Sequence, residues 1–571
     1  MRRLLVLLLC APLAYAEPLP RLTLVIHHLY DGRPLDFAAS TLTTAAGEKI
    51  SVTRLAYLLA EPALKPAGSD EWITNHDWFA FTDAAKGTAT HVLSGLPQQS
   101  FDALRICIGP DAVTDGKDPG IYPPRHALNP TVNGLHWGWT GGFVFLAIEG
   151  NIAAKDGSLG YSYHLAGAAN RMTVTLPTAI DLTQDTTIDV DFHVDRLFAG
   201  SPPLVLAEQT STHSRPGDAL ATRLKTQVES AFAIRSIHRT EDASLPAAAG
   251  STAPLVGTPY RFTFPRGFPM PELPTDFPLT EERVVLGRAL FHDVRLSRNQ
   301  SQSCATCHDP TFVFSDPRPF SIGIDGQRGT RHAMPLFNLA WKREFFWDGR
   351  AASLRQQALE PIENPIEMHE SLPHVVEKLS ADAATVDAFA KAYGTREITA
   401  ERLGVALEAF MLTLVSFDSK FDRSLRGEAT LTDAERRGFE LFVTEYDPRR
   451  EQFGADCFHC HGGALFTDHA FRNNGLDTSD PGRAAVTHLE SDRGKFATPS
   501  LRDVALTAPY MHDARFATLE EVIAHYDHGV ERTPALDPNL GKHPATGLNL
   551  SAADQAALVA FLKTLTGSSR P

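Results

Sequence analysis

Cys304-Ala-Thr-Cys307-His308 and Cys457-Phe-His-Cys460-His461 are the two stretches that decide how this chain of 571 residues is interpreted. Each is a Cys-x-x-Cys-His run, the pattern typical of covalent c-type haem attachment. The two thiols form thioethers to one porphyrin, and the adjacent His becomes an axial ligand of the iron. A zinc half-site or a redox dithiol also uses Cys-x-x-Cys, but neither requires a His directly after it. Two such runs therefore predict two c-type haems.

The composition is typical of a soluble protein with several domains. The chain is too long for a single core, and its 43% hydrophobic and 21% charged residues are ordinary values. The formal net charge of −15 argues against nucleic acid and anionic membrane surfaces as partners. A small basic redox protein, such as a c-type cytochrome, would fit this charge.

Residues 1–16 are predicted to be a cleavable signal peptide. A basic start, Met1-Arg2-Arg3, precedes an apolar run and an Ala-x-Ala pattern that ends at Ala16. No later stretch reaches the ~18 apolar residues of a membrane span. We therefore expect a periplasmic protein without a membrane span. Cys10 leaves with the signal peptide, and Cys107, in an apolar run, is expected to be a buried hydrophobic side chain.

The rest of the chain divides into a β-rich half and a helical half. In residues 17–235, apolar residues alternate with polar ones, as in Ile188 to Val194, which predicts an all-β sandwich or barrel-like domain. Residues 236–279 are rich in Pro, Ala, Gly, Ser and Thr and are interpreted as a linker. Capping-box patterns such as Thr432-x-x-Glu435 follow. They predict two mainly α cytochrome c-type haem domains, over residues 280–425 and 426–571.

Residues from about 268 to 567 resemble the bacterial di-haem cytochrome c peroxidases, and within them the MauG/MbnH-like enzymes. The matching runs include Leu286-Gly-Arg-Ala-Leu-Phe291, Phe346-Trp-Asp-Gly-Arg-Ala351, Glu360-Pro-Ile-Glu-Asn-Pro-Ile-Glu-Met368 and Thr507-Ala-Pro-Tyr-Met-His-Asp513. The resemblance implies that the haem on His308, in the first haem domain, binds H2O2. It also implies a distal pocket formed by Gln357 and Glu367, and a Trp between the haems, Trp347. Without it, Trp347 would be interpreted as a core aromatic and Glu367 as a solvated charge.

For the haem on His461, the resemblance implies Tyr526 as the sixth ligand, with Met511 as the alternative. A phenolate ligand lowers the reduction potential, whereas Met raises it. A Tyr-ligated haem therefore favours a high-valent state that both irons share. The family also holds calcium between the haems, and Thr507 and Pro509 are candidate calcium ligands. However, His332 stands where the family usually has Asn, so calcium binding is left open.

Residues from about 20 to 235 resemble the MbnP-like copper-binding proteins. The runs are Gly134-Leu-His-Trp-Gly-Trp-Thr-Gly-Gly-Phe-Val-Phe145, Tyr163-His-Leu-Ala-Gly167 and Ser211-Thr-His-Ser214. In that family a MauG-like partner oxidises a Trp of the His-Trp-x-Trp run to kynurenine, which then helps to bind copper. The substrate candidates are Trp137 and Trp139. Imidazole suits copper, and the candidate ligands are His27, His28, His136, His164 and His213.

Three functions remain open from the sequence. The first is a di-haem peroxidase or oxidase that reacts with H2O2 and oxidises a Trp in its own or a partner MbnP-like domain. The second is a cytochrome c peroxidase that detoxifies H2O2 with electrons from a small cytochrome. The third is a non-enzymatic copper-binding or electron-transfer protein.

Overall fold

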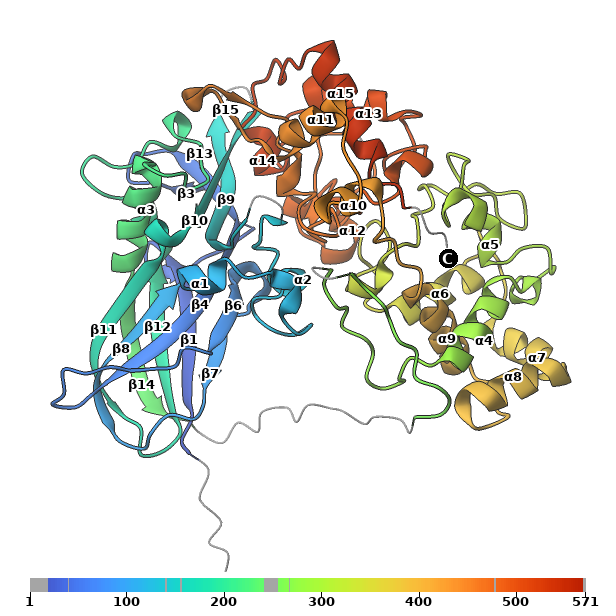
Figure 1. Ribbon diagram of the computed structural model, residues 1–571, viewed down its shortest axis with the longest axis horizontal. Helices are drawn as coiled ribbons and strands as arrows, with labels where there is room; N and C mark the ends of the chain where they lie inside the picture. Colours follow the sequence, from blue (N-terminus) through green and yellow to red (C-terminus); the bar gives the residue numbers. More distant parts are fainter. Residues whose placement is uncertain are drawn as a thin grey trace, which may run out of the picture.

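The computed structural model describes residues 19–38, 41–138, 141–154, 157–240, 255–265, 268–476 and 479–567. The predicted signal peptide and Trp139 lie outside the described residues. Figure 1 shows a β-rich N-terminal half beside two groups of helices. The helices labelled α10 to α15 lie next to the sheets, and those labelled α4 to α9 lie farther away.

The N-terminal half contains two sheets. One has the order β14-β12-β1-β2, with β7 also pairing with β1. The other has the order β11-β8-β4-β9-β10-β13, with β3, β5 and β6 pairing with β4. The strands are β1 (Leu22–Tyr30), β2 (Arg33–Pro34), β3 (Leu42–Thr43), β4 (Lys49–Pro66), β5 (Ile73–Thr74), β6 (Phe79–Asp83), β7 (Thr90–Leu93), β8 (Ser100–Ile108), β9 (Val144–Ala154), β10 (Gly157–Ala166), β11 (Met172–Asp181), β12 (Thr186–His193), β13 (Ser211–Thr212) and β14 (Phe232–Arg239).

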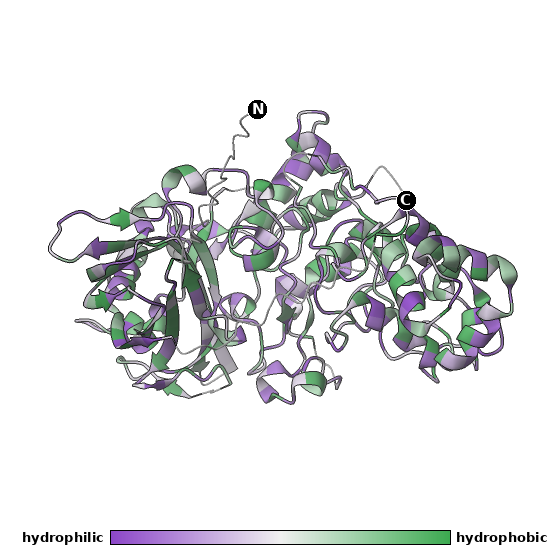
Figure 2. Ribbon diagram, turned by 90° about the horizontal axis from the view of Figure 1, so that it is seen from below, coloured by the Kyte–Doolittle hydropathy of each residue, from purple (hydrophilic) through white to green (hydrophobic). Residues whose placement is uncertain are grey.

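Apolar side chains from both sheets form one core, which confirms the predicted β-rich sandwich. Leu24 and Phe192 come from the first sheet and Ile148 from the second, and all three are buried. Figure 2 shows the strands as largely apolar and many of the connecting loops as hydrophilic. The predicted alternation coincides with β12, where every second residue is buried towards its end. Cys107 on β8 is 7% exposed, as expected for a buried hydrophobic side chain.

Short helices and one longer helix accompany the sheets. They are α1 (Ala112–Asp115), α2 (Pro130–Asn133) and α3 (Ala219–Ser230). α3 packs against β11 and β10. Its N-terminus is capped by the carboxylate of Asp218, which accepts hydrogen bonds from the amides of Leu220 and Ala221.

The helical half forms two domains with separate cores. The first has α4 (Glu281–Phe291), α5 (Cys304–Cys307), α6 (Leu354–Glu363), α7 (Leu372–Ser380), α8 (Ala383–Tyr393) and α9 (Ala400–Leu412). The second has α10 (Lys420–Leu425), α11 (Asp433–Val443), α12 (Ala484–Thr487), α13 (Leu519–Ala524), α14 (Pro538–Gly541) and α15 (Ala552–Lys563). It also has the short hairpins β15 (Tyr446–Asp447) with β16 (Gln452–Phe453) and β17 (Phe471–Arg472) with β18 (Phe496–Ala497). The predicted capping box of Thr432 and Glu435 starts α11.

The same helix crossing recurs in both haem domains. α4 packs on α9 in the first domain, and α11 packs on α15 in the second. In each crossing, a Cβ atom added to a glycine would overlap a backbone carbonyl of the partner helix: Gly287 faces Ala406, and Gly438 faces Ala557. The glycines therefore allow the two helices to approach closely in each domain core, and the haem motif of that domain packs against this core.

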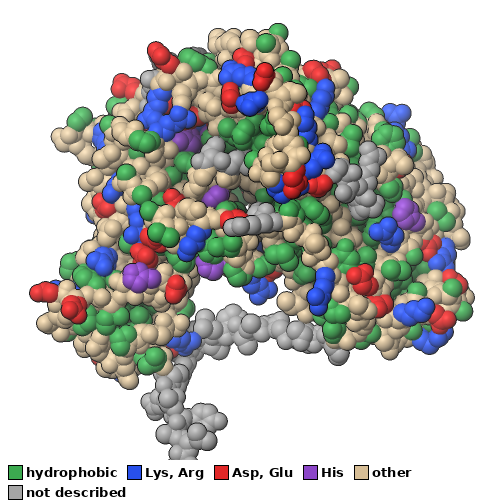
Figure 3. Space-filling view, in the orientation of Figure 1, with side chains coloured by type: hydrophobic (Ala, Val, Ile, Leu, Met, Phe, Trp, Pro, Cys, Tyr) green, Lys and Arg blue, Asp and Glu red, His purple; other side chains and the backbone are tan. Residues whose placement is uncertain are grey.

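The domain edges differ in detail from the predicted boundaries. β14 continues to Arg239, and Phe421 on α10 packs into the core of the second haem domain. In the connecting segment, Phe264 packs at a tilt and Phe268 packs edge-on against Trp341 of the first haem domain. No helix among the described residues is long and apolar enough to cross a membrane. Figure 3 shows acidic and basic side chains interspersed over one face of the molecule.

Candidate functional site

The first Cys-x-x-Cys-His motif lies on the wall of a large cavity. α5 begins in a capping box between Ser303 and Thr306, and His308 follows its last residue. The Nδ1 atom of His308 donates to the carbonyl of Phe314 at 3.1 Å, which leaves Nε2 free to bind a metal. Both thiols and the imidazole line a cavity of about 840 Å³. Burial raises the pKa of Cys304 to about 12, unlike a reactive dithiol. These residues therefore fit a covalently attached haem.

The predicted distal residues line the same cavity. Gln357, on α6, and Glu367, in the following loop, are both part of its wall. The side-chain amide of Asn364 donates to Oε1 of Glu367 at 2.7 Å. Burial raises the pKa of Glu367, with the Asn364 hydrogen bond opposing that shift. Asn364 was not singled out from the sequence, although it lies within the Glu-Asn-Pro run that matched the family.

Trp347 lies where the two haem domains meet. Its indole nitrogen donates to the carbonyl of His332 at 2.8 Å, and its own carbonyl accepts from the amide of Ala497 in the second domain at 2.8 Å. The indole is buried and its ring centre is 6.5 Å from that of His512. His332 also lines the first cavity, where its Nε2 has no hydrogen-bond partner among the described residues.

The second motif repeats the local geometry of the first. Cys457 and His459 form a single 3₁₀ turn, and His461 donates from Nδ1 to the carbonyl of Phe466 at 3.2 Å. Burial raises the pKa of Cys457 to about 12 as well. The His461 imidazole is thus oriented by a backbone carbonyl five residues later in the chain. The His308 imidazole is oriented in the same way, by a carbonyl six residues later.

Tyr526 faces the second motif from a turn at the end of α13. This turn, His525–Gly529, is wound as a π-helix, a feature often found at functional sites. Burial raises the pKa of Tyr526 to about 12, opposed by a hydrogen bond from Asn474, with the Cys460 and Cys457 thiols adding to the rise. The Nδ2 atom of Asn474 lies 3.4 Å from the Tyr526 hydroxyl and 3.5 Å from the Met511 sulfur. Both candidate sixth ligands therefore contact the side-chain amide of Asn474, which is a further residue of this site.

The calcium candidates have partners of their own. The hydroxyl of Thr507 donates to the carbonyl of Val504 at 3.2 Å, and Pro509 follows a cis peptide bond. The backbone of His332 is tied to that of His512 by a hydrogen bond of 2.7 Å. Calcium binding by Thr507 and Pro509 stays a prediction.

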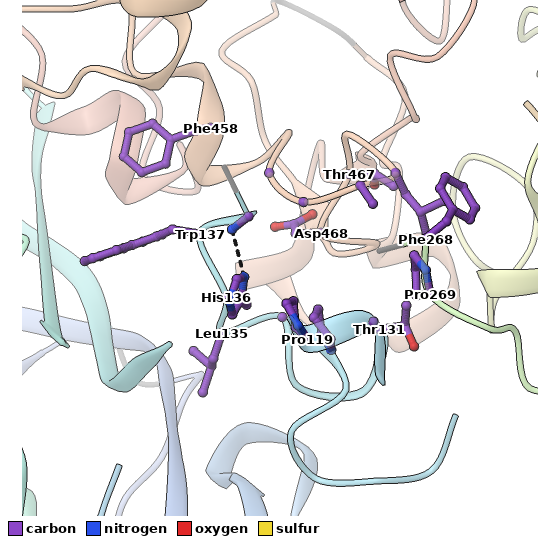
Figure 4. A pocket seen from close by; sticks show the side chains of 18 of the residues that line it. Pro119, Thr131, Leu135, His136, Trp137, Phe268, Pro269, Phe458, Thr467 and Asp468 are labelled. Atoms are coloured by element: carbon purple, nitrogen blue, oxygen red, sulfur yellow. Dashed lines mark hydrogen bonds between the residues drawn. The ribbon is translucent and has the colours of Figure 1, made fainter. Parts of the chain in front are cut away.

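Trp137 lies at the contact between the N-terminal half and the second haem domain. It packs against the cores of both. A cavity of about 290 Å³ is lined by Trp137 together with Phe458, His459 and Gly463 of the haem-attachment segment. Figure 4 shows the Trp137 indole and the Phe458 ring on the same side of the pocket, to the left of His136. The next residue, Gly138, lies so close to Gly463 that a Cβ atom there would be 3.1 Å from its Cα.

The five histidines proposed for copper separate into two groups. His27 contacts Asp189 at 2.7 Å, and His28 contacts the Tyr57 hydroxyl at 2.8 Å. His136 accepts from the amide of Gly138 at 2.9 Å. None of these three belongs to the metal-competent cluster found among the described residues, which consists of His164, His213 and His459. His459, the residue between Phe458 and Cys460 in the second motif, was not predicted from the sequence; its signal was an extra His inside the motif.

Buried charges join the N-terminal half to the second haem domain. Glu149 on β9 accepts from Arg54 at 2.8 Å and from the side-chain amide of Asn539 at 3.3 Å, and lies 3.7 Å from Arg472. Arg472 also pairs with Asp537 at 2.5 Å. The pKa of Glu149 is well below its usual range, because Arg54 and then His164 and Arg472 outweigh the desolvation of the carboxylate.

The fold and the two haem-attachment sites define a di-haem oxidoreductase with an additional β-sandwich. Residues 281–430 match the family model described as di-haem cytochrome c peroxidase, and residues 20–214 match the MbnP model. The chain belongs to the di-haem cytochrome c peroxidase family, with an MbnP domain fused before it.

Three relatives illustrate the match. Methylamine utilization protein MauG of Methylorubrum extorquens is 40% identical over 310 residues, covering 53% of this chain and 83% of that protein. Cytochrome c551 peroxidase of Pseudomonas aeruginosa is 35% identical over 315 residues, covering 52% and 84%. The crystal structure of a MauG-like protein associated with microbial copper homeostasis is 36% identical, covers 54% of this chain and 96% of that one, and gives a TM-score of 0.49. The two sequence relatives show that the haem half is a di-haem peroxidase-type oxidoreductase.

Proposed function

We propose that this protein is a periplasmic di-haem peroxidase that uses H2O2 to oxidise Trp137 of its own N-terminal half to kynurenine. One observation carries the proposal: Trp137 packs into the core of the second haem domain and shares a cavity with its haem-attachment segment. The indole is therefore held beside a redox centre without a diffusing partner.

Residues of the first cavity prepare peroxide for cleavage. A haem held there by Cys304, Cys307 and His308 would supply the redox chemistry for cleavage of the O–O bond. Oε1 of Glu367 is held by Asn364, so Oε2 is the atom available to take a proton from one peroxide oxygen and return it to the other. Gln357 on the same wall can orient the peroxide by hydrogen bonding. The oxygen that receives the proton can then leave as water.

Trp347 and Tyr526 direct the oxidising equivalents towards Trp137. The indole of Trp347 is held between the two domains by its hydrogen bond to the His332 carbonyl. A Tyr526 ligand would lower the potential of the second haem, which makes it a poor entry point for electrons from a cytochrome. The half-buried indole of Trp137 is then an oxidisable side chain that lines the same cavity as Phe458 and Gly463 of the second haem-attachment segment.

The stoichiometry is fixed by the chemistry. Conversion of Trp to N-formylkynurenine inserts two oxygen atoms into the indole and removes four electrons, so it consumes two H2O2 and releases two waters. Hydrolysis of the formyl group then releases formate and leaves kynurenine. Copper is the metal that we propose for the N-terminal half, with His164 and His213 as the two of its candidate histidines that lie together.

Peptide mass spectrometry of the holo-protein after peroxide addition tests this function. We expect Trp137 to be converted to kynurenine with two peroxides consumed per chain, while Trp72, which stacks on Arg105, stays intact. The Glu367→Gln variant should leave Trp137 unmodified. An intact Trp137 together with rapid peroxide-dependent oxidation of a reduced small cytochrome c would instead support the detoxifying cytochrome c peroxidase.

A further inference from the structure

We propose that His164, His213 and His459 form one metal site that the two halves share, and that it binds copper. His164 lies on β10 and His213 directly follows β13, whereas His459 lies inside the second haem-attachment motif. Among the described residues, the N-terminal half therefore supplies two of the three ligands. The third is brought to the site by the docking of the haem half.

Three imidazole nitrogens converge on one point. Nε2 of His213 lies 3.1 Å from Nδ1 of His164 and 2.5 Å from Nε2 of His459. The ligand atoms of all three lie within 4.8 Å of one another. Nitrogens bound to one metal at roughly 2.0–2.1 Å are about 3.3–3.6 Å apart, so small side-chain movements suffice to accommodate an ion.

Each imidazole has a carboxylate against its opposite nitrogen. Nε2 of His164 contacts Glu149 at 3.0 Å, and Nδ1 of His213 lies 2.6 Å from Glu445. Nδ1 of His459 lies 2.7 Å from Asp456.

A carboxylate on the outer nitrogen is the arrangement that orients metal-bound histidines and makes them better ligands. With the outer nitrogens carrying the protons, the three inner nitrogens present lone pairs to one another. Such an arrangement is favourable when a cation lies between them.

Cationic side chains near the three histidines are paired with the carboxylates behind them. The ammonium of Lys542 lies 2.9 Å from Asp456 and 3.3 Å from Glu445, and Glu149 is paired with Arg54 and Arg472. Three imidazoles without a thiolate suit copper or zinc, and copper binds more tightly to a given nitrogen site in the order of divalent ions. The site opens to the Trp137 cavity, because His164 and His459 are also part of its wall.

Metal titration of the holo-protein, in the absence of peroxide, tests the site independently of Trp137 oxidation. Copper is added to the full chain, and after dialysis the bound metal is counted and its EPR spectrum recorded. We expect one copper per chain, with nitrogen hyperfine splitting from three imidazoles. Zinc, used as a second probe, should bind to the same site and be displaced by copper.

The decisive variant is His459→Gln, because the residue between the two Cys of the motif is not used in haem attachment. It should lower copper affinity by at least tenfold, and His164→Gln and His213→Gln should do the same. Glu445→Gln, which removes the carboxylate behind His213, should lower affinity about 10–100-fold. His469→Gln is the matched control, since His469 is a histidine of the same domain outside the cluster and should leave copper binding unchanged.

A redox titration supplies a second measurement. A cation beside His459 adds positive charge next to the haem on His461, so copper should raise the potential of that haem and leave that of the His308 haem unchanged. Copper bound with equal affinity by wild type and His459→Gln, with both haems attached, would overturn the proposal. Failure of the wild type to retain copper or zinc would overturn it as well.

Discussion

At the scale of single residues, the two haem sites differ in what faces the motif. Glu367 and Gln357 line the same cavity as His308, whereas at the other site Tyr526 lies near Cys457 and Cys460 and shares the neighbour Asn474 with Met511. The first arrangement leaves room for a small substrate, and the second offers a protein ligand. These side chains therefore separate the roles of two otherwise similar motifs.

Replacing the distal carboxylate should remove proton transfer without removing the haem. Glu367→Gln is expected to lower the rate of peroxide cleavage by ~10²–10⁴-fold, the usual contribution of a positioned acid–base group. Glu363→Gln, at an exposed position of α6, is the matched control and should have near wild-type activity. Stopped-flow absorbance of the haem after mixing with peroxide measures the rate, and an unchanged rate in Glu367→Gln would contradict the assignment.

The pH dependence of this step follows from the same carboxylate. Burial raises the pKa of Glu367, so the group takes up its proton at a higher pH than an ordinary Glu. Only the ionised form can accept the proton of peroxide. The rate should therefore fall as the pH drops through the raised pKa, and rise to a plateau above it. The acid limb should disappear in Glu367→Gln; a limb of the same position in that variant would assign it to another group.

The two candidate ligands of the second haem can be separated by paired substitutions. Tyr526→Phe should alter the visible and EPR spectra of the haem on His461, whereas Met511→Leu should leave them unchanged. Tyr526→Met should raise the reduction potential, because thioether ligation favours the reduced iron. Spectra that respond to Met511→Leu and not to Tyr526→Phe would reverse the assignment.

At the scale of elements, each haem motif packs against a core that is built on the same kind of crossing of two helices. Gly287 brings α4 onto α9, and Gly438 brings α11 onto α15. Both motif histidines donate to a backbone carbonyl a few residues ahead. Because the helix crossing and the histidine orientation are the same in both domains, they do not explain the different chemistry of the two sites. We infer that the residues outside these crossing helices account for it.

Adding one methyl group at such a crossing should destabilise its haem domain. In Gly438→Ala the new Cβ would overlap the carbonyl of Ala557, and the helices would have to separate, at a cost of about 1–3 kcal/mol. Gly404→Ala, on α9, is the control, because there the nearest atom is the tip of the flexible Leu359 side chain at 3.1 Å. The nearest backbone atom at that position, the Arg355 carbonyl oxygen, lies 3.3 Å away, compared with 2.0 Å for that of Ala557 at Gly438. Thermal unfolding followed by haem absorbance measures both; equal melting temperatures would rule out close approach as the reason for Gly438.

The sequence predicted most of these elements but not how the halves meet. Cys-x-x-Cys-His spacing, capping boxes and strand alternation are local patterns, so both motifs, α11 and β12 were found where expected. The role of Asn474, by contrast, depends on a contact with Tyr526 that is far away in the chain. His459 could be seen beside Cys460, but its neighbours His164 and His213 come from a different domain, and only the docked structure brings them together.

At the scale of the whole molecule, buried ion pairs hold the N-terminal half against the second haem domain. Arg472 is 12% exposed at its side chain and contacts Asp468, Asp537 and Glu149. The polar contacts extend to Asn539 on α14, which donates to Oε2 of Glu149, the carboxylate oxygen that also faces Arg472. The contact between the β-sandwich and the second haem domain is therefore expected to be stable only when the buried charges at this interface are paired.

Removing one partner of this network should be costly. Arg472→Met leaves Asp468 and Asp537 without their buried cation and removes one of the two cations that face Glu149, so it is expected to destabilise the docked state by about 3–5 kcal/mol. Arg493→Met, which breaks only an exposed pair with Glu490, should have little effect. Small-angle scattering and urea unfolding of the two variants measure docking and stability. An Arg472→Met protein as compact and stable as wild type would show that the apolar contacts alone hold the halves together.

The placement of Trp137 between two cores of one chain has a kinetic consequence. An enzyme that is covalently joined to its only substrate residue meets it at a fixed concentration, so dilution should not slow the oxidation. Each molecule can also complete the conversion only once, because the product stays in the place of the reactant. Such a protein completes its own maturation, and its consumption of peroxide should stop once Trp137 has been converted in every molecule.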